Sequence, residues 1–109
     1  MWYEMITKRK IRYILVESSE PIDAGANFLQ IRDGIAHFIG ELGAVEANIR
    51  FIKQYGPSLF AVSANRGTEK RAVAAFSMVK QVNGKPVGFY TLKTSGTLKS
   101  ISEFAATLG

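Results

Sequence analysis

The segment 11–17 (IRYILVE) constrains the fold most, because apolar side chains occur in both of its alternating sets of positions. Its β-branched and aromatic residues are typical of a β-strand, in which successive side chains point to opposite faces of the sheet. Tyr13 and Leu15 would lie on one face, and Ile14 and Val16 on the other. Since a strand that is apolar on both faces needs cover on both faces, the sequence predicts a central strand in a sheet packed on two sides.

Helices and strands alternate along the rest of the chain. Asn27 can cap a helix that runs to about Leu42 and ends before Gly43. One face of this helix carries apolar residues at helical spacing, namely Phe28, Ile31, Ile35, Phe38 and Leu42. The remaining elements are predicted as strands over 46–55, 59–64 and 87–94 and as helices over 68–82 and 98–108.

The order of these elements is βαββαβ followed by a C-terminal helix. That order indicates an α+β, ferredoxin-like (RRM-like) fold, an antiparallel sheet with two helices on one face. We expect the C-terminal helix, or a partner protein, to cover the other face. The chain, 1–109, is expected to form a single domain, with 1–9 as an N-terminal extension that is either a flexible end or an apolar tether.

The positive charge of the chain is concentrated in its second part. Residues 1–46 carry five Lys or Arg and seven Asp or Glu, a net charge of −2, whereas residues 47–109 carry nine and two, a net charge of +7. Such a basic segment attracts polyanions, which favours a nucleic-acid partner. A basic protein that binds no nucleic acid has the same charge pattern, and charge alone leaves this alternative open.

Four places carry the basic side chains that we expect to bind RNA. These side chains are Lys8, Arg9, Lys10, Arg12, Arg50, Arg66, Lys70, Arg71, Lys93 and Lys99. Two of the places are also predicted helix N-termini, where free N–H groups and the helix dipole favour anions. An anion site at these helix starts would comprise Gly67, Thr68, Ser95, Gly96 and Thr97. Solvation of the N-terminal cations and ordinary helix capping remain the plainer alternatives.

Base stacking on the sheet is not supported, because segment 57–62 lacks the basic-aromatic motif of RNA-recognition sheets. No catalytic constellation is visible either. His37 is the only histidine, there is no cysteine, and no metal-ligand spacing or phosphate-binding glycine fingerprint occurs. We therefore expect no catalytic residue, metal or cofactor on this chain. A small enzyme with an unrecognised site stays open, since sites can assemble from distant residues.

No membrane association is expected, because no apolar run approaches the about 20 residues that a bilayer span requires. The first ten residues also lack the apolar block of a signal peptide, so the expected location is cytoplasmic.

Three segments in a fixed order resemble one known family. They are Arg12-Tyr13-Ile14-Leu15-Val16, Asn83-Gly84-Lys85-Pro86-Val87 and, with Leu92 before it, Ser95-Gly96-Thr97-Leu98-Lys99. With the long helix between the first two, they resemble the small α/β subunit of archaeal and eukaryotic nuclear ribonuclease P, called component 2 in archaea. The resemblance runs from about Lys10 to Ile101.

The resemblance implies a role in a ribonucleoprotein that removes the 5′ leader from precursor tRNA. It implies that the catalyst is the RNA subunit with Mg²⁺, so that this chain contacts precursor tRNA only indirectly. Its implied partners are the ribonuclease P RNA, a TIM-barrel-like protein subunit, and a second copy of this chain within a heterotetramer. The competing interpretation from another class is a ferredoxin-like dimeric regulatory or small-ligand-binding module.

Overall fold

The computed structural model describes residues 10–108. Its elements are β1 (Ile11–Ser18), α2 (Phe28–Ala47), β2 (Arg50–Gly56), β3 (Leu59–Asn65), α3 (Glu69–Met78), β4 (Gln81–Val82), β5 (Lys85–Pro86), β6 (Phe89–Ser95) and α4 (Leu98–Leu108). The predicted N-terminal extension at 1–9, which includes Lys8 and Arg9, lies outside the described residues.

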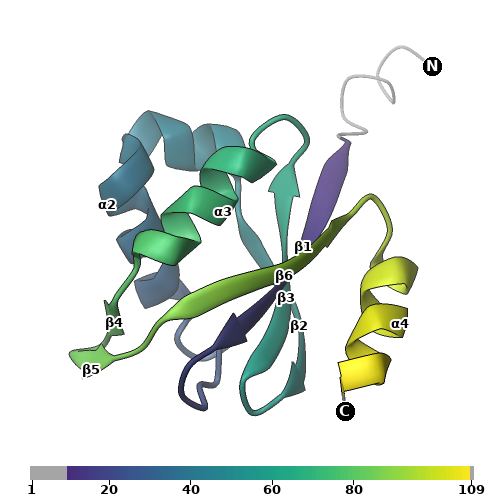
Figure 1. Ribbon diagram of the computed structural model, residues 1–109. Coiled ribbons are helices and arrows are strands. Elements are labelled where there is room, and N and C mark those ends of the chain that lie inside the picture. Colours follow the sequence, from purple (N-terminus) through teal and green to yellow (C-terminus); the bar gives the residue numbers. More distant parts are fainter. Residues whose placement is uncertain (1–9, 109) are drawn as a thin grey trace.

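The main sheet has the strand order β2-β3-β1-β6, and every pair of neighbouring strands is antiparallel. β1 is therefore an inner strand, as its apolar sequence predicted. Helices α2 and α3 lie on one face of the sheet and α4 lies on the other (Figure 1). This arrangement confirms the ferredoxin-like prediction, including the extra C-terminal helix.

Each face of the sheet buries its own apolar layer. Ile14 and Val16 of β1 belong to the larger layer under α2 and α3. Leu15, the residue between them, belongs to a smaller layer that includes Ile101 and Ala105 of α4. Alternate residues of β1 thus contribute side chains to both layers. Helix α4 covers the second face of the sheet, as the sequence required.

Helix α2 is longer than predicted and is broken inside. It continues to Ala47, and Asn48 in the left-handed region ends it, whereas the sequence predicted an end before Gly43. The break lies at Gly40, with φ 79° and ψ 165°, a combination that essentially only glycine adopts. Because this non-helical step resets the helical phase, Leu42 does not continue the buried stripe and is 75% exposed. Phe38, also predicted to face the core, is 44% exposed.

The start of α2 also differs from the prediction. Asn27 occupies the N-cap position, but its side chain makes no capping hydrogen bond. Its Nδ2 donates to the Asp23 carbonyl over 2.9 Å, and its Oδ1 accepts from Asn83 Nδ2 over 2.6 Å. Asn27 therefore ties the helix start to a distant turn instead of capping the helix.

Two further predicted boundaries were wrong. Helix α3 ends at Met78 instead of residue 82, because Gln81 and Val82 form the short hairpin β4–β5. Asn83 and Gly84 make its two-residue turn with φ values of 53° and 78°, which is the conformation that Asn-Gly favours in tight hairpins. Strand β2 begins at Arg50, because residues 46 and 47 are still helical.

Candidate nucleic-acid interface

Most of the predicted RNA-binding side chains gather at one end of the main sheet. β1 begins there, β3 and β6 end there, and α3 and α4 start from the loops that follow those two strands. The register pairs Ile11 with Asn65, Tyr13 with Ser95, and Arg50 with Ser63. We call this end of the sheet the basic end, and its cations are Lys10, Arg12, Arg50, Arg66, Lys70, Arg71 and Lys99.

Lys93 does not belong to this group. It is paired with Leu15 in the middle of β1, and its Nζ lies 5.3 Å from the centre of the Phe104 ring of α4. Its charge therefore makes a cation–π contact within the fold, on the face that α4 covers.

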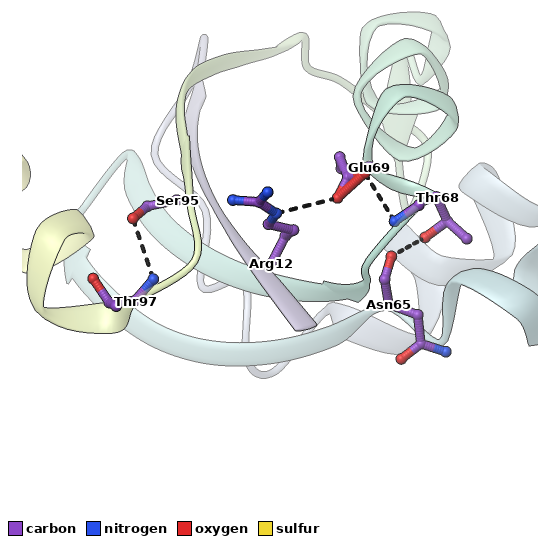
Figure 2. Close-up of polar contacts among 7 residues, drawn as sticks. Arg12, Asn65, Thr68, Glu69, Ser95 and Thr97 are labelled. Atoms are coloured by element: carbon purple, nitrogen blue, oxygen red, sulfur yellow. Dashed lines mark hydrogen bonds and ion pairs between the residues drawn. The ribbon is translucent and has the colours of Figure 1, made fainter. Parts of the chain in front are cut away.

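Arg12 lies between the starts of the two helices, as Figure 2 shows. Its Nε is 3.7 Å from Glu69 Oε2, in the first turn of α3. The other carboxylate oxygen, Glu69 Oε1, accepts a hydrogen bond from the Gly67 N–H over 2.9 Å. The side chains of Arg12 and Glu69 are 36% and 24% exposed, so this ion pair is partly shielded from water.

The loop before α3 satisfies its own backbone groups. The Thr68 hydroxyl donates to the Asn65 carbonyl over 2.6 Å, and the Thr68 N–H donates to the same oxygen over 3.1 Å (Figure 2). Thr68 makes no side-chain cap, and the Gly67 N–H is bound to Glu69. A carboxylate of the chain itself thus accepts the Gly67 N–H, and phosphate binding at Gly67 and Thr68 stays a prediction.

The loop before α4 caps its helix. Thr97 Oγ1 accepts a hydrogen bond from the Ser100 N–H over 3.3 Å, and Ser95 Oγ accepts one from the Thr97 N–H over 3.2 Å. The capping role that the sequence offered for Ser95 and Thr97 is therefore present. Phosphate binding at Gly96 stays a prediction.

The other cations at the basic end differ in their ionic partners. Arg71 Nη1 lies 3.5 Å from Glu46 Oε1, and both side chains are about half exposed. Arg50 Nε is 3.5 Å from Asn48 Oδ1, a neutral partner. Within residues 10–108, the only ion pairs are those of Arg12 and Arg71. The Arg71–Glu46 pair is exposed, and exposed ion pairs contribute little to stability. Because the seven cations outnumber the two carboxylates paired with them, the basic end is a net source of positive potential.

His37 is exposed on α2, and its ring packs edge-on against Phe38 with the ring centres 5.4 Å apart. In the described part of the chain, no three His, Asp or Glu side chains gather where they could ligate a metal ion. No helix between residues 10 and 108 has the length and apolar character of a membrane span.

Sequence reasoning missed the role of Glu69 and the contact of Tyr55. Glu69 is 57 positions from Arg12, and no local pattern links them; only the strand order brings them together. Tyr55 shares a hydrogen bond of 2.6 Å with Ser102, which ties β2 to α4 across the second apolar layer.

Comparison with known proteins gives a consistent result. Residues 12–106 match the model of the Rpp14/Pop5 family. Ribonuclease P protein component 2 of Methanosphaerula palustris is 29% identical over 96 residues, which are 88% of this chain and 59% of that protein. Its counterpart from Methanocorpusculum labreanum is 29% identical over 76 residues, 70% of this chain and 51% of that protein. The chain thus spans little more than half the length of these curated relatives.

A solved structure has the same fold. A chain of the cryo-EM structure of yeast ribonuclease MRP aligns with a TM-score of 0.58 at 12% identity, covering 91% of this chain and 93% of that one. At this identity the likeness concerns the fold alone, and the family assignment rests on the sequence match. Because the family model matches nearly the whole chain, this protein belongs to the Rpp14/Pop5 family.

Proposed function

We propose that this chain is a protein subunit of a ribonuclease P ribonucleoprotein and that its basic end contacts phosphates of the RNA subunit. The observation that carries the proposal is the family match over residues 12–106. The gathering of seven cationic side chains at one end of the sheet supports the RNA contact. In this role the chain supports the RNA that removes the 5′ leader from precursor tRNA.

In this proposal the RNA subunit does the chemistry, with Mg²⁺ bound to the RNA and no cofactor on this chain. The chain touches precursor tRNA only indirectly. Its protein partners are a TIM-barrel-like subunit and a second copy of itself, which together form a heterotetramer. The complex acts in the cytoplasm, away from membranes.

The proposed contact has a measurable electrostatic signature. Each phosphate neutralised by Lys or Arg releases counterions, so the logarithm of the binding constant falls with the logarithm of salt concentration. The slope is roughly −0.7 to −0.9 per phosphate contact. The number of phosphates that the basic end contacts can therefore be counted from affinity measurements at several salt concentrations.

The test is reconstitution of precursor-tRNA cleavage from the RNA and protein subunits, with and without this chain. We expect cleavage to fall when the chain is left out. The double variant Arg66→Ala/Lys70→Ala should lower both cleavage and RNA affinity and make the salt slope shallower by up to roughly 2. The matched control is Lys80→Ala/Lys85→Ala, which removes the same charge from exposed positions near the β4–β5 hairpin, away from the basic end (Figure 1).

Three outcomes would contradict the proposal. Equal losses in both double variants would indicate that only the total charge matters. A chain that binds little RNA at any salt concentration would favour the ligand-binding module instead. Turnover of a substrate in the absence of RNA would identify an enzyme.

A further inference from the structure

A cavity of about 460 Å³ opens at the basic end beside the start of β1. Its lining combines three cations with uncharged residues and contains no carboxylate: Lys10, Ile11, Arg12, Tyr13, Arg66 and Gly96. By contrast, Glu20 and Asp23 both line the cavity of about 590 Å³ near the β4–β5 hairpin. The cavity at the basic end is thus suited to an anion by its composition.

The backbone fixes two of these cations opposite each other. The β1–β3 register pairs Ile11 with Asn65, and the next pair along is Lys10 with Arg66. The Arg66 N–H donates to the Lys10 carbonyl over 2.8 Å, which continues the ladder by one residue. Like charges directly opposite each other on antiparallel strands are destabilising. An anion bound between them would remove that repulsion.

Arg12 presents a second donor edge to the same cavity. Its Nε side faces Glu69, at 3.7 Å from Oε2. Its Nη1 lies 3.5 Å from the position that a Cβ atom on Gly96 would occupy. Arg12 therefore reaches the exposed turn before α4. An arginine held at Nε keeps its two terminal nitrogens for a forked pair of hydrogen bonds to phosphate.

Glu69 is held in place from the other side. Its Oε1 accepts the Gly67 N–H over 2.9 Å, and its Oε2 is buried without a hydrogen bond among the described residues. The nearby Arg12 cation compensates the charge of that oxygen. The carboxylate therefore orients the guanidinium from a fixed position and does not itself line the cavity.

We infer that this cavity binds one phosphate group of an RNA backbone. Arg12 is the forked donor, Lys10 and Arg66 supply flanking charge, and Glu69 is a positioning residue that orients Arg12. The inference rests on the proposed function, because that function supplies the RNA.

The first test measures binding of the full chain to a 20-nucleotide single-stranded RNA of mixed sequence at several salt concentrations. Arg12→Ala should weaken binding at low salt by about tenfold, the effect of losing a charge-assisted hydrogen bond. It should also make the salt slope shallower by roughly 0.7 to 0.9. Arg12→Lys should keep the slope and lose affinity, because it retains the charge without the fork. The matched control is Arg32→Ala, an exposed arginine of α2, which should leave affinity unchanged.

The second test concerns Glu69 and uses a double-mutant cycle. Glu69→Gln keeps an acceptor for the Gly67 N–H but removes the charge that orients Arg12. We expect it to lower RNA affinity in the wild-type background and to have no further effect in the Arg12→Ala background. Losses that simply add would overturn the positioning role. Thermal unfolding of each variant provides the check on folding.

The outcomes separate this inference from the proposed function. If the wild-type chain binds the RNA and Arg12→Ala binds equally well, only the phosphate site is overturned. If the wild-type chain binds no RNA even at low salt, both are overturned. A site-specific readout is the amide signal of Gly96 in an NMR titration, which should move with RNA in the wild type and not in Arg12→Ala.

Discussion

Three phenylalanine rings form the centre of the larger apolar layer. Phe60 of β3, Phe76 of α3 and Phe89 of β6 have ring centres 5.8 to 6.5 Å apart, and two of the three pairs meet edge to face. Phe60 and Phe76 are completely buried. Aromatic pairs in this arrangement stabilise a protein beyond the area that they bury. These rings therefore anchor α3 on the sheet and so fix the position of its basic start.

Truncation of Phe76 tests the importance of this cluster. We expect Phe76→Ala to lower the free energy of unfolding by about 3 to 5 kcal/mol, because it removes a buried ring and leaves a cavity that the surrounding residues fill only in part. Phe38→Ala is the matched control, since Phe38 is exposed on α2, and should cost less than about 1 kcal/mol. Urea unfolding followed by circular dichroism measures both. Similar losses at the two positions would show that Phe38 is buried, as the periodicity of the sequence had predicted.

Among the helices, α2 departs most from its predicted form. In its first half, Ile31 and Ile35 are buried and Phe28 is partly buried against the same layer, so periodicity alone located this half correctly. The second half could not be predicted in this way, because the break at Gly40 shifts the buried positions to Gly43 and Ala47. Glycine lowers helix propensity in every helical context, and the sequence does not distinguish a tolerated glycine from a conformational break.

Substitution of Gly40 distinguishes these two cases by the sign of its effect. In a regular helix, Gly→Ala raises the free energy of unfolding by up to about 1 kcal/mol. With φ 79° and ψ 165°, Ala at position 40 should instead lower it by roughly 1 to 3 kcal/mol, since a Cβ is strained there. The space around Gly40 is open, so steric overlap with other side chains contributes nothing. A stabilised Gly40→Ala variant in thermal unfolding would rule out the break.

The short hairpin β4–β5 shows why another boundary was missed. Val79 and Val82 are apolar and their spacing also fits a helix, but Asn83-Gly84 favours a two-residue turn between strands. The chain follows the turn preference and does not continue the helix. Val82 is still buried, but it lies in an extended strand. Boundaries that depend on such a competition are not decided by periodicity.

At the level of the entire chain, the sequence predicted the parts of the candidate site but not their assembly. Each basic segment could be recognised by its residue types and by the helix or strand that it precedes. Their meeting depends on the strand order β2-β3-β1-β6, which places the start of β1 beside the ends of β3 and β6. Lys93 shows what charge alone cannot predict. The bulged register of β1 and β6 places it on the sheet face that α4 covers, where it contacts Phe104.

The distribution of exposed apolar side chains has a consequence for the isolated chain. Since α4 covers the second face of the sheet, the uncovered apolar side chains are mainly those of the two helices on the opposite face. They include Phe38, Leu42 and Val45 of α2 and Met78 of α3. Apolar side chains that are exposed together favour association. We therefore expect the isolated chain to self-associate at micromolar concentrations, with little dependence on salt.

The double variant Leu42→Glu/Val45→Glu should shift the isolated chain toward the monomer in sedimentation measurements. Its free energy of unfolding should change by less than about 1 kcal/mol, because both side chains are exposed in the fold. The control Leu108→Glu places the same charge on an exposed apolar position of α4, on the other side of the sheet, and should leave self-association unchanged. A wild-type chain that stays monomeric throughout would contradict this expectation. Val45 is the neighbour of Glu46, which pairs with Arg71 at the basic end, so the added negative charge should also weaken RNA binding in the monomeric variant.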